Sequence, residues 1–403
     1  MGLHEAGNVQ RCVHRMSRDR KKLLVACPRG RVFSGTTLSG YPSFLVPELS
    51  THFDVEIADG LSVPKPGFSK RIRNRLQDLL GLRAFRYTTA NVERARSWSD
   101  WLESRIAESQ PDAVLSLFQM SVAFLKTSVP VFMYLDAVYR YKTILNPDEY
   151  CYDDLSVAER NDIDAVDHGS LKCCKRAFFM SSTIAETCKK LYPTYASKIS
   201  TVGVGANIET KEAVGRRRVV DGGEVCILFV ASSFERKGGD TALEACRLLR
   251  ENGIRVRLRM LGDLPKQSRV SKHLAEHQDW IEYRGWVNKE LEKDKAYYYD
   301  TLEESHIHLL PTRYDTNPHV ICEANAYGIP TVARSIGGIP DVVLDRVTGI
   351  LVSSSDPKDY ADGIKQVIAD YDIYSANARS LFIREQNWAL VAGRIASEIH
   401  AAL

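Results

Sequence analysis

The sequence predicts an α/β fold with two open, doubly wound parallel sheets, and three observations lead to this prediction. Short apolar runs recur between helical stretches, at 23–27, 54–58, 113–117, 129–135, 176–181 and 198–202 in the first half and at 225–231, 256–261, 281–285, 307–311, 330–333 and 349–352 in the second. Strands that alternate with helices form parallel sheets covered on both faces. The length of 403 residues suits two domains of roughly 200 residues each. A polar, glycine-bearing stretch at 203–223 separates the two sets and indicates a linker.

The expected domains are residues 1–205 and 206–380, with the remaining segment returning to the first domain. Residues 380–403 carry apolar side chains at helical spacing, at Leu381, Trp388, Val391, Ile395 and Ile399. This pattern predicts one terminal helix that packs on the first domain. Open parallel sheets bind ligands at the carboxyl ends of their strands, so the cleft between the domains is the expected site.

The amino-acid composition and the cysteine pattern limit the classes of protein to which the chain can belong. Apolar residues make up 44% and charged residues 26% of the chain, which is typical of a soluble globular protein. The nine cysteines include no C-x-x-C spacing and several lie in apolar runs, which indicates reduced thiols. No run reaches the ~18 apolar residues of a membrane span, and the start of the chain has no apolar signal region. We therefore expect a cytoplasmic protein.

The segment DTNPHVICEANAYGIPTVARSIGGIPD, residues 315–341, carries two carboxylates beside a predicted helix start. Asn317 followed by Pro318 is a helix cap followed by a first helical residue, and Gly328 supplies the stop. Asp315 is then in the loop after a strand, and Glu323 is one to two turns into the helix. Both are expected to border one crevice.

Two ionised carboxylates about one sugar apart suit a polyhydroxylated ligand, because each accepts two adjacent hydroxyls. The helix start between them favours a ligand that also carries negative charge. A nucleotide sugar meets both requirements. The alternative is that Asp315 is a loop cap and Glu323 a solvated helix residue.

A second segment, VCILFVASSFERKGGDTALEACRLL, places Arg236, Lys237, Gly238 and Gly239 between a predicted strand and a predicted helix. Cations neutralise a diphosphate, and bare glycine backbone lets its amides approach. The segment therefore predicts a diphosphate site. The alternative is a basic turn whose glycine only relieves strain.

With these motifs the chain resembles the retaining glycosyltransferases of family 4, which have the GT-B fold: two facing Rossmann-like domains with an interdomain cleft. The resemblance lies in FVASSFERKGGD, MLGD, YRGWV and LLPTRYDTNPHVICEANAYGIPTVARSIGGIPDVVLDRVTGILV, which follow one another in the order of the family. It spans residues 225–352. In the first domain YLDA and FFMSSTIAETCKKLYP fit less closely.

The resemblance implies roles for individual residues. Arg236 and Lys237 hold the donor diphosphate and stabilise its developing charge, and removal of either is expected to lower turnover with little effect on folding. Glu323 accepts the ribose hydroxyls. Asp315 meets the donor sugar, where the family usually has the longer Glu. Asp136, after the run 131–135, lies near sugar and acceptor, or is a helix cap.

Further donor contacts are expected from the loops and from one helix start. His319 is either a ligand of the sugar or a structural residue, and one of two glycines in the loop 34–40 approaches the diphosphate. The additional donor-binding candidates are Gly238, Asn317, the backbone amides of His319 and Val320, and Gly35 or Gly40.

The implied reaction is transfer of a hexosyl group, with retention, from a UDP- or GDP-linked sugar to an acceptor hydroxyl during polysaccharide or glycolipid biosynthesis. We expect no metal, no other cofactor and no nucleic acid partner. The alternatives are another GT-B enzyme, such as a phosphorylase or a nucleotide-sugar epimerase, and a non-catalytic nucleotide-sugar-binding scaffold.

The segment FSKRIRNRLQDLL, residues 68–80, is predicted to form a helix with one apolar face surrounded by basic residues. Such a helix lies on an anionic membrane surface, or it packs on the first domain with solvated arginines. The first alternative implies a lipid-linked glycan acceptor and reversible docking on the inner face of the membrane.

Overall fold

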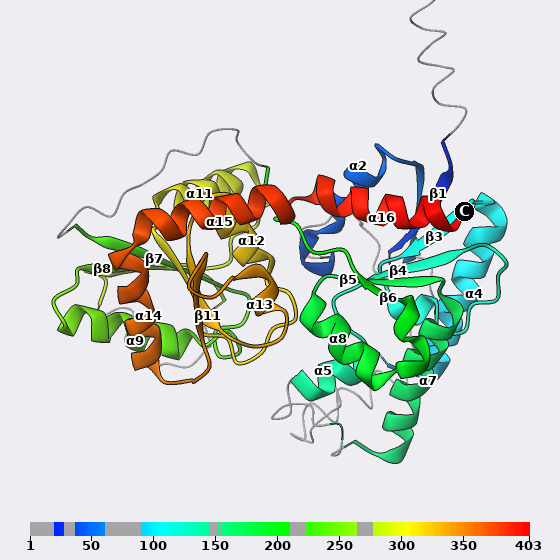
Figure 1. The fold of residues 1–403 in the computed structure, drawn as a ribbon, viewed down its shortest axis with the longest axis horizontal. Helices are drawn as coiled ribbons and strands as arrows, with labels where there is room; N and C mark the ends of the chain where they lie inside the picture. The colour runs from blue at the N-terminus through cyan, green and yellow to red at the C-terminus, as the bar shows by residue number, and fades with distance from the viewer. Residues whose placement is uncertain are drawn as a thin grey trace, which may run out of the picture.

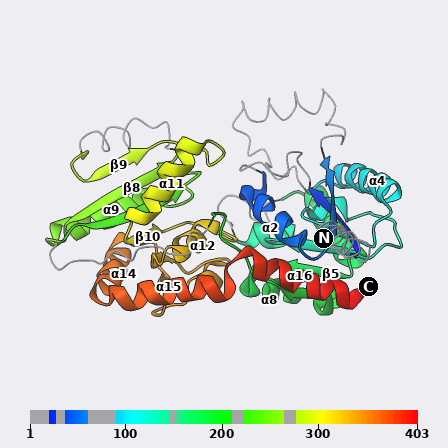
Figure 2. The ribbon, with the colours of Figure 1, turned by 90° about the horizontal axis from the view of Figure 1, so that it is seen from above.

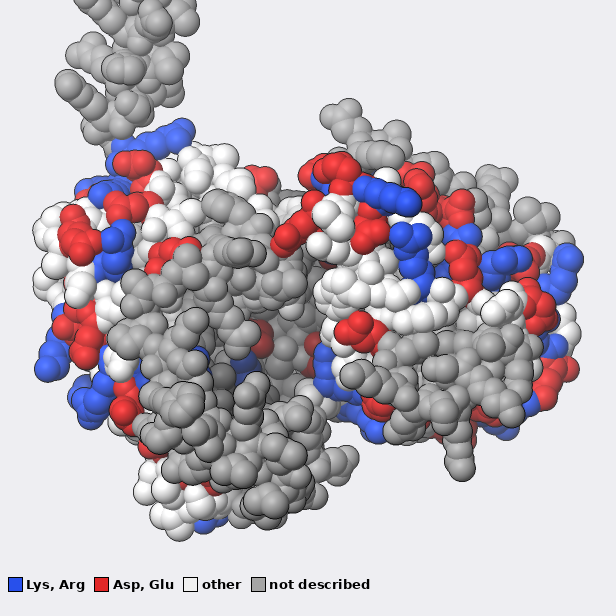
Figure 3. Space-filling view, turned by 180° about the vertical axis from the view of Figure 1, so that it is seen from behind, with Lys and Arg blue, Asp and Glu red and all other residues white. Residues whose placement is uncertain are grey.

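The computed structural model describes residues 20–27, 37–60, 90–145, 152, 155–209, 223–263 and 277–403. They form two α/β domains that lie side by side (Figure 1). The expected membrane-binding segment 68–80 and Gly35 lie outside these residues. On the face shown in Figure 3, acidic and basic side chains are interspersed over both domains.

The first domain contains a parallel sheet with strand order β2-β1-β3-β4-β5-β6. Its strands are β1 (Lys22–Cys27), β2 (Asp54–Asp59), β3 (Ala113–Ser116), β4 (Val131–Leu135), β5 (Arg176–Phe179) and β6 (Ile199–Thr201). The helices around it are α2 (Pro42–Leu49), α4 (Val92–Ser109), α5 (Tyr139–Leu145), α7 (Val157–Cys173) and α8 (Ser182–Leu191), with short 3-10 turns at η1 (Thr37–Gly40), η3 (Gln119–Ser121) and η5 (Pro193–Lys198).

The second domain repeats this plan with strand order β12-β11-β10-β7-β8-β9. Its strands are β7 (Val225–Ala231), β8 (Val256–Gly262), β9 (Ile281–Arg284), β10 (Ile307–Leu310), β11 (Thr331–Arg334) and β12 (Gly349–Val352). Its helices are α9 (Gly239–Glu251), α11 (Glu292–Glu304), α12 (His319–Ala326), α13 (Ile339–Val342), α14 (Pro357–Ala369) and α15 (Tyr371–Glu385).

Each apolar run that the sequence predicted as a strand forms one, and all strand pairs in the two sheets are parallel. The predicted doubly wound fold is confirmed. In the second sheet β8 and β9 lie on one side of β7, and β10, β11 and β12 lie on its other side. The switch point of the sheet is therefore between β7 and β10, which are neighbours. Loops that follow two such strands leave the same edge of the sheet and diverge, which opens a crevice at that point.

The predicted single helix over 380–403 is wrong. The segment belongs to two helices, α15, which ends at Glu385, and α16 (Trp388–Ala402). The break occurs because the Asn387 side chain accepts a hydrogen bond from the amide of Leu390, 3.0 Å away, and so caps a new helix. α15 lies on the second domain, and α16 crosses to pack against α2 of the first (Figures 1 and 2).

Apolar side chains of α16 join the core of the first domain. Trp388, Val391, Ile395 and Ile399 are buried in a cluster that includes Leu45 of α2. The chain therefore passes between the domains at two places, once before β7 and once between α15 and α16.

A carboxylate of the second domain accepts hydrogen bonds from the amino-terminal turn of a helix of the first domain. Asp341 in α13 accepts hydrogen bonds from the Ser182 hydroxyl at 2.7 Å and from the amide and hydroxyl of Thr183 at 3.1 and 3.0 Å. It also accepts one from the Ser181 hydroxyl. These groups form the amino-terminal turn of α8, where negative charge is favourable, so the contact fixes the two domains relative to each other.

Candidate functional site

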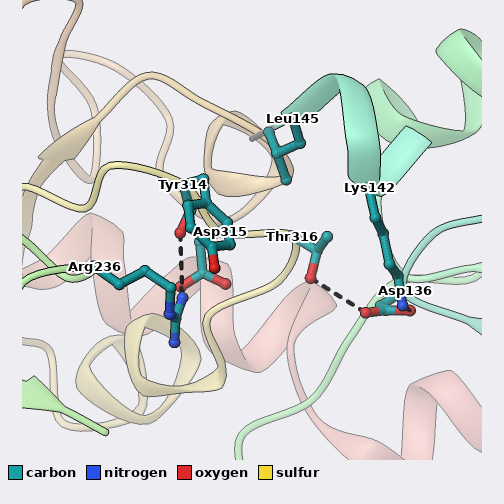
Figure 4. Close-up of a pocket in the computed structure, with 7 residues that line it drawn as sticks. All are labelled: Asp136, Lys142, Leu145, Arg236, Tyr314, Asp315 and Thr316. Atoms are coloured by element: carbon teal, nitrogen blue, oxygen red, sulfur yellow. Dashed lines mark hydrogen bonds and ion pairs between the residues drawn. The ribbon is translucent and has the colours of Figure 1, made fainter. Parts of the chain in front are cut away.

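A pocket lies between the two domains at the carboxyl ends of their strands (Figure 4). Its wall in the first domain consists of Asp136, Lys142 and Leu145, and its wall in the second consists of Arg236, Tyr314, Asp315 and Thr316. The volume of the pocket is about 140 Å³, below the range of about 300 to 1,000 Å³ for small-molecule sites. A ligand of nucleotide-sugar size would therefore extend beyond it.

The cationic loop after β7 and the acidic loop after β10 meet at the switch point of the second sheet. The backbone oxygen of Arg236 accepts hydrogen bonds from the Arg313 amide at 2.8 Å and the Thr312 hydroxyl at 3.1 Å. The Lys237 ammonium donates to the Asp315 carboxylate, and an Arg236 guanidinium nitrogen lies 4.0 Å from the same oxygen. The three residues that the sequence predicted at a donor site are therefore together.

Lys237 and Asp315 form a buried ion pair, since each is only 8% exposed. Burial lowers the pKa of Lys237, and the charge of Asp315 opposes that change. Beneath them His308 in β10 is fully buried, and burial together with the charge of Lys237 lowers its pKa to about 3. Of the two predicted cations, Arg236 is the one that lines the pocket.

Arg236 is held in place by the residue next to Asp315. A guanidinium nitrogen donates to the Tyr314 backbone oxygen at 3.2 Å, and the guanidinium carbon lies 5.2 Å from the centre of the Tyr314 ring. Arg236 thus spans the gap between its own loop and the loop after β10. Its cation faces the pocket from the side of the second domain (Figure 4).

Glycines allow these loops to approach other backbone closely. Gly238 has φ of 74°, and a Cβ there would lie 2.1 Å from the Pro311 oxygen. Gly337 has φ of 60°, and a Cβ there would lie 1.8 Å from the Asp315 oxygen. Both positions require glycine. Close packing of the backbone therefore explains why residue 238 is glycine. The two glycines of SIGGIPD let the backbone pack closely against the loop that carries Asp315.

Asp136 reaches across the cleft from the end of β4. Its Oδ1 accepts a hydrogen bond from the Ala137 amide at 2.8 Å and forms an ion pair with Lys142 Nζ at 3.0 Å. Its Oδ2 accepts one from the Thr316 hydroxyl of the second domain at 3.3 Å. Its alternative assignment as a helix cap is wrong, because a different residue caps the following helix, α5.

That cap is Asp167 of α7, which is fully buried. Its carboxylate accepts hydrogen bonds from the amides of Tyr139 and Arg140, both at 3.0 Å, and from Gln119 and Tyr192 at 2.7 and 2.8 Å. Burial raises the pKa of Asp167 to about 6, although these hydrogen bonds act in the opposite direction. Asp167 thereby fixes α5, the helix that carries two residues of the pocket wall.

Glu323 lies apart from the pocket wall, in α12. It is 3% exposed, so the alternative of a solvated helix residue is wrong. Its Oε1 accepts a hydrogen bond from Lys289 Nζ at 2.9 Å, and its Oε2 accepts one from the Tyr298 hydroxyl. Asp315 and Glu323 therefore occupy different surroundings, and of the two only Asp315 lines the pocket.

Helix α12 begins at His319, one residue later than predicted, because Pro318 has extended backbone with ψ of 97°. The His319 ring packs against both Tyr41 and Trp388, with centroid distances of 5.8 and 5.9 Å, and its Nδ1 lies 3.2 Å from the Gly205 oxygen. Burial lowers the pKa of His319. Its side chain thus connects the two domains, as its structural alternative proposed.

The remaining donor-binding candidates lie around the same helix start. The amides of His319 and Val320 precede the first amide bonded within the helix, that of Ile321 to Pro318 O at 3.0 Å. The Asn317 amide group contacts the Asp136 backbone oxygen at 3.4 Å. Gly40 ends η1 with φ of 80°.

Comparison with known proteins agrees with this geometry. Residues 211–381 match the family described as glycosyl transferases group 1. The match covers the second domain. The chain is 34% identical over 140 residues to the putative colanic acid biosynthesis glycosyltransferase WcaL of Escherichia coli, a match that covers 33% of each chain. It is 30% identical over 200 residues to the D-inositol 3-phosphate glycosyltransferase of Xylanimonas cellulosilytica, covering 46% of each.

The matches to these curated relatives thus span a third to just under half of their length. The structure superposes on sucrose-phosphate synthase of Thermosynechococcus elongatus with a TM-score of 0.66 at 15% identity, covering 95% of this chain and 100% of that one. This likeness shows the fold, and the fold is GT-B.

Several residues that line the pocket were not predicted from the sequence. Lys142 and Leu145 lie on α5, and their place on the wall depends on how that helix is packed. Tyr314 and Thr316 flank Asp315 directly, so the motif itself could have indicated them. In the described ranges no three His, Cys, Asp or Glu side chains form a metal-binding group. No helix of the described part is long and apolar enough to cross a membrane.

Proposed function

We propose that the chain transfers a glycosyl group from a nucleoside diphosphate sugar to an acceptor hydroxyl, with retention of configuration and without a metal. The observation that carries this proposal is the pocket between the domains. It has Arg236 and Asp315 on the side of the family-matched domain and Asp136 with Lys142 on the opposite side. Cations for a leaving diphosphate and carboxylates for sugar hydroxyls thus face one space.

In the proposed reaction the bond between the anomeric carbon and the diphosphate oxygen breaks, and its electron pair remains on the phosphate. The acceptor oxygen bonds to the anomeric carbon on the same face, and its proton passes to the leaving phosphate oxygen. Arg236, with Lys237 behind it, stabilises the charge that develops there. This route needs no carboxylate as nucleophile, unlike a retaining glycosidase.

The other residues orient the substrates. Asp315 accepts hydroxyls of the donor sugar, and its pairing with Lys237 keeps its short side chain directed along the second-domain wall. Asp136, which contacts both Lys142 and Thr316, borders the sugar and the acceptor. Glu323 accepts the ribose hydroxyls outside the pocket. The amides of His319 and Val320 and the loop that contains Gly40 complete the donor site.

The proposed donor is a UDP- or GDP-linked hexose, and the proposed process is the biosynthesis of a polysaccharide or glycolipid. The similarity to WcaL, whose name assigns it to colanic acid biosynthesis, supports the process. We propose that the protein acts in the cytoplasm and docks on anionic membrane through residues 68–80. Sedimentation with anionic and neutral vesicles tests this docking, and equal recovery in both supernatants would favour a soluble acceptor.

A thermal-shift panel of nucleoside diphosphates and their sugars tests the central proposal. One base should raise the melting temperature of the protein, both as free diphosphate and as sugar conjugate. Turnover of that conjugate should need an acceptor and should give a product of unchanged anomeric configuration by NMR. A requirement for inorganic phosphate would favour a phosphorylase. Conversion of the donor without an acceptor would favour an epimerase, and binding of the donor without turnover would favour a non-catalytic scaffold.

A further inference from the structure

Lys289, in the loop before α11, holds its ammonium group against Glu323. Its Nζ lies 2.9 Å from Glu323 Oε1 and 3.3 Å from the Asn207 backbone oxygen. It also lies 4.8 Å from the centre of the Tyr298 ring. An ammonium group has three donors and no acceptor, and a ring face attracts a cation. The Lys289 ammonium group is therefore held by the Glu323 carboxylate, the Asn207 backbone oxygen and the Tyr298 ring.

Tyr298 in α11 fixes the other carboxylate oxygen. Its hydroxyl donates to Glu323 Oε2, and the residue is 3% exposed. Burial, together with the charge of Glu323, raises the pKa of Tyr298 well above its usual range, so the hydroxyl remains a donor. A carboxylate has about two acceptor positions on each oxygen. Among the described residues each oxygen of Glu323 has one hydrogen-bond partner, so one acceptor position on each is left for two adjacent hydroxyls.

We propose that Lys289 and Tyr298 are positioning residues that hold the Glu323 carboxylate in the orientation that meets both ribose hydroxyls of the donor. This inference rests on the proposed function. A carboxylate as deeply buried as Glu323 is costly without a partner, because its charge is removed from water. Neither residue is part of the pocket wall that faces the sugar. They therefore affect the affinity for the donor and the preference for nucleotides that have ribose hydroxyls. They take no direct part in the transfer step.

The test compares nucleotides with and without ribose hydroxyls by calorimetry. The ligands are the tighter-binding of UDP and GDP and its 2′,3′-dideoxy counterpart. Lys289→Met should weaken binding of the ribonucleotide about tenfold, as expected for loss of a charged hydrogen-bonding group. Binding of the dideoxynucleotide should change by less than about twofold, because it has no hydroxyls for Glu323 to accept.

Three further variants sharpen the result. Lys289→Arg should restore ribonucleotide binding, and Tyr298→Phe should reproduce the Lys289→Met pattern. In the transfer assay Lys289→Met should raise the KM for the donor about tenfold and leave kcat within about twofold. The matched control is Lys295→Met in α11, the helix that follows Lys289, since Lys295 pairs with Glu209 at 2.6 Å.

The other outcomes of these measurements would overturn either the inference alone or the inference together with the proposed function. Equal weakening of both nucleotides by Lys289→Met would show a general structural role and overturn the inference. Unchanged ribonucleotide affinity in both Lys289→Met and Tyr298→Phe would overturn it as well, while leaving the proposed function intact. If neither UDP nor GDP binds to the unaltered protein, the proposed function fails and the inference fails with it.

Discussion

Replacing Lys237 with Met should destabilise the protein as well as inactivate it, contrary to the expectation from sequence that folding is little affected. The variant leaves the Asp315 carboxylate, which is 8% exposed, without its main cation. Removing one partner of a buried ion pair costs about 3 to 5 kcal/mol. Because the pair borders a pocket, we expect the lower end, about 3 kcal/mol. For a domain of this size that corresponds to a decrease in Tm of about 6 to 12 °C.

The assay is urea unfolding at pH 7, followed by circular dichroism, in a double-mutant cycle with Asp315→Asn. The double variant should be more stable than the sum of the single effects predicts, by at least about 1.5 kcal/mol, since the two side chains are in contact. The control is Arg313→Met, which breaks the exposed pair with Asp240 at 3.1 Å and should cost less than about 0.5 kcal/mol. Additive single effects would refute the ion-pair reasoning.

Three other perturbations have distinct expected results. Arg236→Ala should lower turnover by about 10² to 10³ with little change in Tm, and turnover within about twofold would contradict its assignment to the leaving group. Asp167 has a raised pKa of about 6 in the folded chain, so its contribution to stability is present below its unfolded value and is lost as pH rises through 6. The difference in unfolding free energy between the unaltered protein and Asp167→Asn should thus fall by up to about 3 kcal/mol from pH 4 to pH 7. Parallel stability curves for the two proteins would exclude this effect. Asp341→Ala removes the acceptor of the Ser182 and Thr183 hydrogen bonds between the domains and should cost about 1 kcal/mol, and calorimetry should show the two domains unfolding in better-separated transitions. A thermogram identical to that of the unaltered protein would show that the contact does not couple them.

The strands were predictable from sequence because most of them are short runs of apolar residues buried on both faces; β2, β6 and β9 are only partly buried. The break at Asn387 was missed because the apolar spacing continues across it, although Asn before an apolar run is itself a helix-start signal. In such cases a local capping contact outweighs a longer periodic pattern.

The site was predictable to the extent that its residues lie in local motifs. Arg236, Lys237 and Asp315 follow neighbouring strands, so the topology brings them together. Lys142, Lys289 and Tyr298 owe their positions to tertiary packing of α5 and α11, and no local pattern distinguishes them from surface residues. Asp167 was hidden in the polar run DIDAVD, where only the packing shows which carboxylate is buried.

The position of α16 in the sequence affects how the protein folds during synthesis. Trp388, Val391, Ile395 and Ile399 complete the core of the first domain, yet the ribosome produces them only after the whole second domain. At about 5 to 20 residues per second, the stretch from β6 to the end of α16 takes roughly 10 to 40 seconds to translate. During that interval the apolar face of α2 has no cover from its own chain. A chaperone that binds nascent chains would find its target on this surface, and the second domain can finish folding before the first.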